Sequence, residues 1–115
     1  MSISYEGIGA WCATFAGAKL SEGAVVKTSA NGTVSACTAG DKFCGVVAAA
    51  SRDKEACSVQ LAGLVKVKYS GSTAPEVGYR VLCADGQGGV RVGESGRSRL
   101  VVEKNAAEST ATIML

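Results

Sequence analysis

Cysteine has the widest chemical range of the residue types in this chain, since a thiolate can act as a nucleophile, a redox group or a metal ligand. The chain has five cysteines and no histidine. Zinc sites made from cysteine alone use closely spaced pairs, and the nearest two here, Cys37 and Cys44, are too far apart for that motif. Without histidine, nothing marks one cysteine for activation as a nucleophile. We therefore predict reduced thiols, no disulfides and no metal site.

Two of the cysteines fit an inward-facing position on a strand. Cys57 alternates in phase with Val59, and Cys83 alternates in phase with Tyr79 and Val81. A free cysteine packs as a small apolar side chain. The pattern predicts that these residues face a core.

The chain also lacks the residues on which most other kinds of catalytic site depend. The absence of histidine removes the commonest general base and the triads that depend on it, and the carboxylates show no pairing that a glycosidase would need. Residues 86–89, Gly-Gln-Gly-Gly, resemble a phosphate-binding loop, but such loops lead into a helix and here a strand is predicted to follow. We predict no enzyme activity, no catalytic residues and no cofactor.

Positive charge is concentrated in the later half of the chain, at Arg80, Arg91, Arg97 and Arg99. Small barrels that bind single-stranded nucleic acid combine a basic groove with stacking aromatic rings, yet no aromatic residue follows Tyr79, and the net charge is only +2. We therefore expect no nucleic-acid partner. The arginines are interpreted either as a solvated face or as contacts to acidic residues of a protein partner.

The overall composition is that of a globular protein. The chain has 115 residues, of which 47% are apolar and 19% are charged, so one folding unit with its own core is expected. No apolar run approaches the ~18 residues that a membrane span needs, and no membrane partner is predicted. Residues 1–6 show no leader pattern, so synthesis in the cytoplasm without secretion is expected.

Residues 56–69 carry the clearest strand pattern, because Val65 and Val67 alternate with Lys66 and other polar side chains. The stretch is long for one strand, and Gly63 at its middle predicts a kink at a barrel corner. With this stretch the chain is predicted to contain about nine short strands. The others are expected at residues 11–15, 25–29, 33–36, 43–48, 79–84, 90–92, 100–104 and 110–115.

Turn signals separate these strands. Asn31-Gly32 and Asp85-Gly86 predict hairpins with type I′ turns, which need positive φ. Fifteen glycines and one proline suit the many corners of an all-β fold, a small antiparallel β-barrel or sandwich, better than a helical fold. The stretches 16–22 and 48–56 are treated as connections.

The sequence also indicates an internal duplication. A Gly-x-x-Val motif followed by a turn signal begins at Gly23 and again at Gly78, a spacing of about 55 residues, and Val46-Val47 corresponds to Val101-Val102. Two similar meanders of about four strands each would close one barrel with few free edges. Chance alignment of glycine and valine in a β-protein is the alternative.

The motifs, in order, are Gly-x-Val-Val-Lys (23–27), Asn-Gly-Thr-Val (31–34), Phe-Cys-Gly-Val-Val (43–47), Val-Gln-Leu-Ala-Gly-Leu-Val-Lys-Val (59–67), Val-Gly-Tyr-Arg-Val-Leu (77–82), Asp-Gly-x-Gly-Gly-Val (85–90) and Thr-Ile-Met-Leu (112–115). This order, over residues 13–115, resembles the capsid decoration (cement) proteins of tailed bacteriophages and prophages.

The resemblance implies a β-barrel structural protein of the virion, made in the bacterial host cytoplasm and bound to the capsid exterior. Its partner would be the major capsid protein, whose lattice it would stabilise, and a homotrimer is expected. The family carries no catalytic residues. Two alternatives stay open: a ligand-binding β-barrel module for carbohydrate or nucleic acid, which would show a concave site rimmed by exposed aromatics, and another phage component such as a tail subunit.

The N-terminal segment is the candidate contact region. Residues 1–17 are interpreted as an N-terminal arm or first strand, and residues 18–115 as a single β-barrel-like domain. Tyr5, Trp11 and Phe15 are the predicted protein-interface residues, because large aromatic side chains bury much area at little entropic cost. The alternative is that Trp11 and Phe15 fill the domain's own core.

Overall fold

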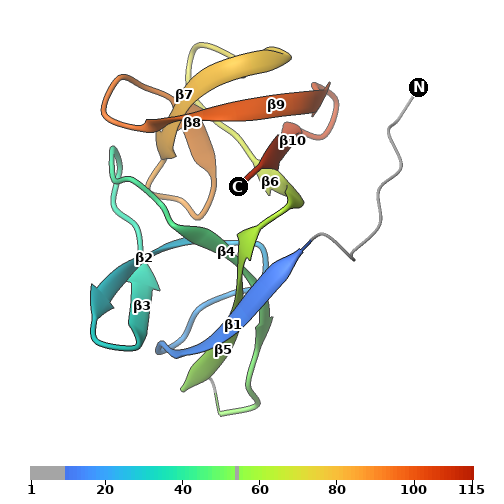
Figure 1. The fold of residues 1–115 in the computed structure, drawn as a ribbon. Helices are drawn as coiled ribbons and strands as arrows, with labels where there is room; N and C mark the ends of the chain where they lie inside the picture. Colours follow the sequence, from blue (N-terminus) through green and yellow to red (C-terminus); the bar gives the residue numbers. More distant parts are fainter. Residues whose placement is uncertain (1–9, 54) are drawn as a thin grey trace.

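The computed structural model describes residues 10–53 and 55–115. Within these ranges the chain is all-β, with ten strands and no helix, as Figure 1 shows. The strands are β1 (Trp11–Ala16), β2 (Val25–Ala30), β3 (Thr33–Ala36), β4 (Gly45–Ala50), β5 (Ala56–Ala62), β6 (Leu64–Lys68), β7 (Gly78–Ala84), β8 (Val90–Val92), β9 (Arg97–Asn105) and β10 (Thr110–Met114).

The first half of the chain closes a five-stranded barrel in the order β1-β3-β2-β4-β5. Antiparallel pairing of β1 with β5 sets Phe15 opposite Cys57, and a single parallel pair, Ala16 with Thr33, joins β1 to β3. Closure leaves this half with few unpaired strand edges.

The second half repeats the first. Its strands follow the order β6-β10-β9-β7-β8, so β6 to β10 have the same neighbours as β1 to β5, and a parallel bridge between Tyr69 and Val90 links the two ends of the sheet as the β1–β3 pair does. Figure 1 shows the two units stacked, β1 to β5 below and β6 to β10 above. The predicted barrel and internal duplication are confirmed. The expectation of one barrel closed by two four-stranded meanders is wrong, because each unit has five strands and the first closes by itself.

Gly63 divides the stretch that was predicted as one kinked strand. Its φ of 97° is a conformation that L side chains rarely adopt, and it separates β5 from β6. The kink is confirmed, but the two parts belong to different sheets. Period-two alternation runs through both parts, so the pattern alone did not show that the chain changes sheets here.

The valine pairs of β2 and β4 bind the two units together. Val26 and Val47 lie in the core inside the first barrel, whereas Val25 and Val46 lie in a second core with residues of the other unit. Successive strand residues point to opposite faces, so at these valines both faces of β2 and β4 are buried. The second core continues through Phe43 and apolar residues of the second unit, namely Val67, Leu82, Ala84, Val90, Val101, Ala111 and Ile113.

The first predicted hairpin is present between β2 and β3. Of its two turn residues only Gly32 has a positive φ, 66°, so a type I′ turn, which needs positive φ at both, is wrong. The β2–β3 register shifts between Thr28 and Ala30. A β-bulge therefore accommodates the turn.

The second hairpin, between β7 and β8, is a longer loop organised by one carboxylate. Oδ1 of Asp85 accepts hydrogen bonds from the backbone N–H groups of Gln87 (2.7 Å) and Gly89 (3.0 Å), and Oδ2 accepts one from Ser70 Oγ (2.8 Å). Strand β8 follows at once. The hairpin reading of the glycine-rich stretch is confirmed, since no helix follows the loop that could hold a phosphate.

A second carboxylate fixes the loop between β3 and β4. Asp41 Oδ2 accepts hydrogen bonds from Lys27 Nζ (2.6 Å) and from the backbone N–H and Oγ1 of Thr38 (2.9 Å each). The hydrogen bond from Lys27 is the largest cause that lowers the pKa of Asp41 to about 2, and those from Thr38 add to it.

A pH dependence follows from this lowered pKa. A carboxyl group with a depressed pKa in the folded state stabilises the protein above its unfolded pKa of about 3.9, and loses that contribution as the pH falls toward 2. We expect the free energy of unfolding of the wild type to fall more steeply between about pH 4 and pH 2 than that of Asp41→Asn. Urea denaturation at several pH values measures both slopes, and equal slopes would contradict the role of Asp41.

Candidate protein-interaction face

Several large apolar side chains of the described residues lie in solvent rather than in either core. Trp11 is 74% exposed and Tyr79 is 71% exposed. The other members of this group are Val77, Val81 and Met114. Aromatic residues are enriched in the cores of protein interfaces, and exposed apolar patches on soluble proteins mark interaction sites.

The three predicted contact residues differ in their placement. Trp11 is the first residue of β1, pairs with Ala62 of β5, and projects into solvent. Phe15 is partly buried and packs against the core of the first barrel. Tyr5 lies outside the described residues. The core alternative is therefore correct for Phe15 and wrong for Trp11.

Tyr79 and Val81 form a second exposed apolar region at the start of β7. Tyr79 is opposite Leu100 of β9 and Val81 is opposite Ser98, so these side chains share one face. The prediction that Tyr79 and Val81 face a core is wrong, whereas Cys83, two residues further on, is buried as predicted.

The cause is the short partner strand on the other edge of β7. Strand β8 pairs only with Leu82 to Ala84, so the first half of β7 has β9 as its only strand partner. The turn at Gly93 also covers Cys83, because a Cβ at Gly93 would lie 2.8 Å from the Cys83 sulfur. Alternation in the sequence identified the strand face on which Tyr79 lies, but not how much of that face is covered by other parts of the chain.

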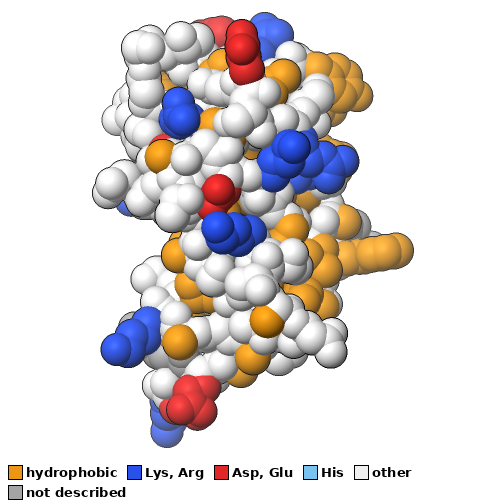
Figure 2. Space-filling view, turned by 90° about the vertical axis from the view of Figure 1, so that its left-hand side faces the viewer, with side chains coloured by type: hydrophobic (Ala, Val, Ile, Leu, Met, Phe, Trp, Pro, Cys, Tyr) orange, Lys and Arg blue, Asp and Glu red, His pale blue; other side chains and the backbone are white. Residues whose placement is uncertain are grey.

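Basic side chains lie on both faces of this sheet, with Arg80 and Arg99 on the face opposite to Tyr79 and Val81. Figure 2 shows the largest group of Lys and Arg side chains beside hydrophobic side chains along one side of the molecule. Arg80 and Arg99 are directly opposite each other on β7 and β9. Arg91 of β8 is opposite Cys83, on the other face of the sheet from Arg97.

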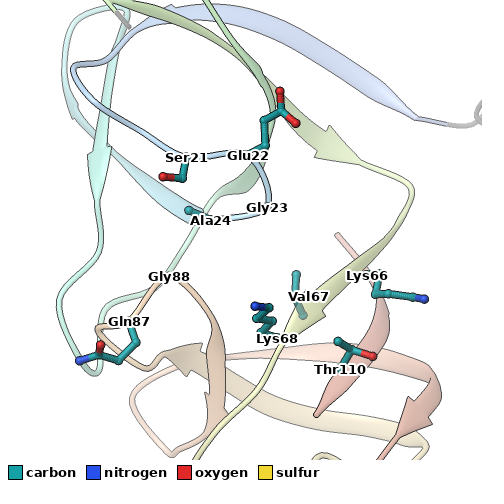
Figure 3. Close-up of a pocket in the computed structure, with 10 residues that line it drawn as sticks. All are labelled: Ser21, Glu22, Gly23, Ala24, Lys66, Val67, Lys68, Gln87, Gly88 and Thr110. Atoms are coloured by element: carbon teal, nitrogen blue, oxygen red, sulfur yellow. The ribbon is translucent and has the colours of Figure 1, made fainter. Parts of the chain in front are cut away.

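A cleft of about 340 Å³ lies between the two units. As Figure 3 shows, the loop at Ser21–Ala24 forms one wall, and β6 with Thr110 forms the opposite wall. Its lining residues are Ser21, Glu22, Gly23, Ala24, Lys66, Val67, Lys68, Gln87, Gly88 and Thr110. None of these carries an aromatic ring on which a sugar or a base would stack.

The cysteines of the described residues are free thiols. Burial raises the pKa of Cys37 to about 11 and also raises the pKa values of Cys44 and Cys57. These three thiols therefore stay protonated near neutral pH and are poor nucleophiles. No group of three or more possible metal ligands occurs within residues 10–53 and 55–115.

The chain was compared with family models and with curated proteins. No family model matches the chain, and no curated protein matches it significantly. In the part of the chain that the structure describes, no helix has the length and apolar character needed to cross a bilayer.

Proposed function

We propose that the protein is a capsid decoration protein, which binds the outer surface of an assembled phage head as a homotrimer and stabilises the major capsid protein lattice. The observation that carries the proposal is the exposure of Trp11 and Tyr79 on regular β-strands. The order of the strand and turn motifs resembles that of the decoration proteins, and this resemblance suggests the major capsid protein as the partner.

The fold suits this task. A decoration protein adds contact area across several shell subunits after assembly, and its effect is multiplied by symmetry and avidity rather than by one strong site. Two β-units joined through a shared core present rigid strands, so few degrees of freedom are lost when Trp11 or Tyr79 becomes buried in an interface.

The ligand-binding alternative has less support. A carbohydrate or nucleic-acid module would be expected to carry aromatic rings around its concave site. The cleft between the two units is lined by small, aliphatic, lysine, glutamate and glutamine side chains and by no aromatic ring.

Co-sedimentation tests the proposal directly. The purified chain is mixed with phage heads that lack the protein, and the pellet is analysed, while light scattering measures the oligomeric state of the free protein. Saturable binding to heads together with a trimer supports the proposal. A monomer that stays in the supernatant at all concentrations overturns it.

Replacing Trp11 with alanine is expected to weaken binding to heads by at least tenfold, because a buried tryptophan anchor typically contributes 2 kcal/mol or more, about thirtyfold. The free energy of unfolding should change by less than about 0.5 kcal/mol, since the side chain is exposed. Thr14→Ala, an exposed position on the same strand, is the matched control. Unchanged binding by Trp11→Ala would exclude this residue from the interface.

A further inference from the structure

Three arginines lie on one face of β7 and β9. Arg80 is directly opposite Arg99 in the strand register, and residues in that relation point to the same face. Arg97 precedes Arg99 by two positions on β9, which places it on that face as well. We refer to Arg80, Arg97 and Arg99 as the arginine cluster.

Two carboxylates of the described chain form ion pairs with lysines rather than with this cluster. Asp41 pairs with Lys27, and Glu76 pairs with Lys104. Like charges directly opposite each other destabilise a sheet. Burial and then the charge of Arg97 lower the pKa of Arg99.

Two of the guanidinium groups are held in place by the fold. Arg99 donates from Nη2 to the backbone carbonyl of Phe43 (3.0 Å), and its Cζ lies 5.0 Å from the centre of the Phe43 ring. Arg80 donates from Nη1 to the carbonyl of Tyr79 (3.0 Å) and from Nη2 to that of Val77 (3.2 Å). A positioned arginine loses less conformational entropy when it binds a further group.

Donors remain free for a ligand. A guanidinium has five N–H groups, and these contacts use one bond of Arg99 and two of Arg80. Nε of Arg99 is buried without a partner, so the open donors of this residue are on its Nη atoms. The side chain of Arg97 is exposed and makes no hydrogen bond or ion pair within the described residues. The planar fork of N–H groups matches a carboxylate in a bidentate arrangement.

We propose that the arginine cluster binds an acidic segment of a protein, with Asp or Glu carboxylates bridging the three guanidinium groups. Protein is favoured over nucleic acid because no free ring flanks the cluster: the Phe43 ring is covered by Arg99, and Tyr79 lies on the opposite face of β7. Arginine is also enriched at protein interfaces. The inference rests on the proposed function for the partner's identity, which would be a shell protein.

The first experiment measures binding to heads lacking the protein. Arg97→Glu should bind about tenfold or more weakly than the wild type, with a flatter dependence on salt concentration, because a favourable charge contact becomes repulsive. The matched control is Arg52→Glu, a reversal at an exposed arginine in the turn between β4 and β5, which should bind as the wild type does. Equal affinity of Arg97→Glu and the wild type would overturn the inference and leave the proposed function intact.

The second experiment does not depend on heads. Hexaglutamate, at millimolar concentration, should shift the amide NMR signals of β7 and β9 in the wild type and in Arg52→Glu, but not in Arg97→Glu. Arg97→Gln should also lose the shifts while unfolding at a slightly higher temperature, since it relieves repulsion within the cluster. Absence of shifts in the wild type overturns the inference. Tighter binding of a single-stranded oligonucleotide at the same signals would overturn it in favour of a nucleic acid.

Discussion

Replacing Phe43 with alanine is expected to lower the free energy of unfolding by roughly 3–5 kcal/mol, the usual range for truncation of a buried phenylalanine. Phe43 is nearly fully buried, and it belongs to the loop before β4 while packing in the core shared with the second unit. Its loss opens a cavity between the units and also removes the ring beneath Arg99. Urea denaturation followed by fluorescence and by circular dichroism measures the effect.

Phe43→Leu is the control, because it retains an apolar side chain and should cost less than about 1.5 kcal/mol. Since the shared core joins both units, the alanine variant should still unfold in one transition with coincident signals. If Phe43→Ala lowered the free energy of unfolding by less than about 1 kcal/mol, the placement of this ring in the shared core would be wrong. Two separate transitions would show that the units unfold independently.

Gly45→Ala is expected to cost about 3 kcal/mol or more, because the added methyl group would overlap fixed atoms. A Cβ at residue 45 would collide with the backbone carbonyl oxygen of Gln60 and would lie 2.7 Å from Cγ1 of Val59. Gly45 is held from both sides, since it pairs with Val26 of β2 while β4 is also paired with β5. The structure offers no flexible side chain that could move aside for the backbone contact.

Gly32→Ala separates this steric cost from the conformational cost of replacing a glycine. Gly32 has a φ of 66° and open space around its Cβ position, so its substitution should cost only about 1 kcal/mol from backbone strain. Thermal or urea unfolding of both variants provides the comparison. If Gly45→Ala were no more destabilising than Gly32→Ala, the close approach of β4 and β5 would be wrong.

Substitutions in the cores and substitutions at exposed residues are expected to change different properties of this protein. Phe43 and Gly45 act on the free energy of unfolding, because Phe43 packs in the core shared by the two units and Gly45 lies where β4 and β5 approach each other closely. Trp11 and Arg97 are exposed, so their replacement is expected to alter binding and leave folding nearly unchanged. This separation makes the binding variants informative, since loss of binding in a folded protein reports on the surface.

The amino-acid sequence by itself determined the local elements. Alternating apolar residues predicted most of the strands, Asn31-Gly32 and Asp85-Gly86 marked real hairpins, and the repeated Gly-x-x-Val motif indicated the duplication. These features are short-range: they depend on side-chain periodicity and on the φ values that turn residues tolerate.

Only the tertiary structure decided how the strands are assembled into two sheets and which side chains stay exposed to solvent. Gly63 sends one continuous alternating stretch into two sheets, and the pairing of β7 with β9 places Arg80 opposite Arg99. Tyr79 lies in solvent although its pattern fitted a core, and only the structure shows that Trp11 does not fill the core of its own domain. The physical reason is that alternation assigns a side chain to a face of its strand, whereas burial of that face depends on which strands, loops and turns far along the chain pack over it.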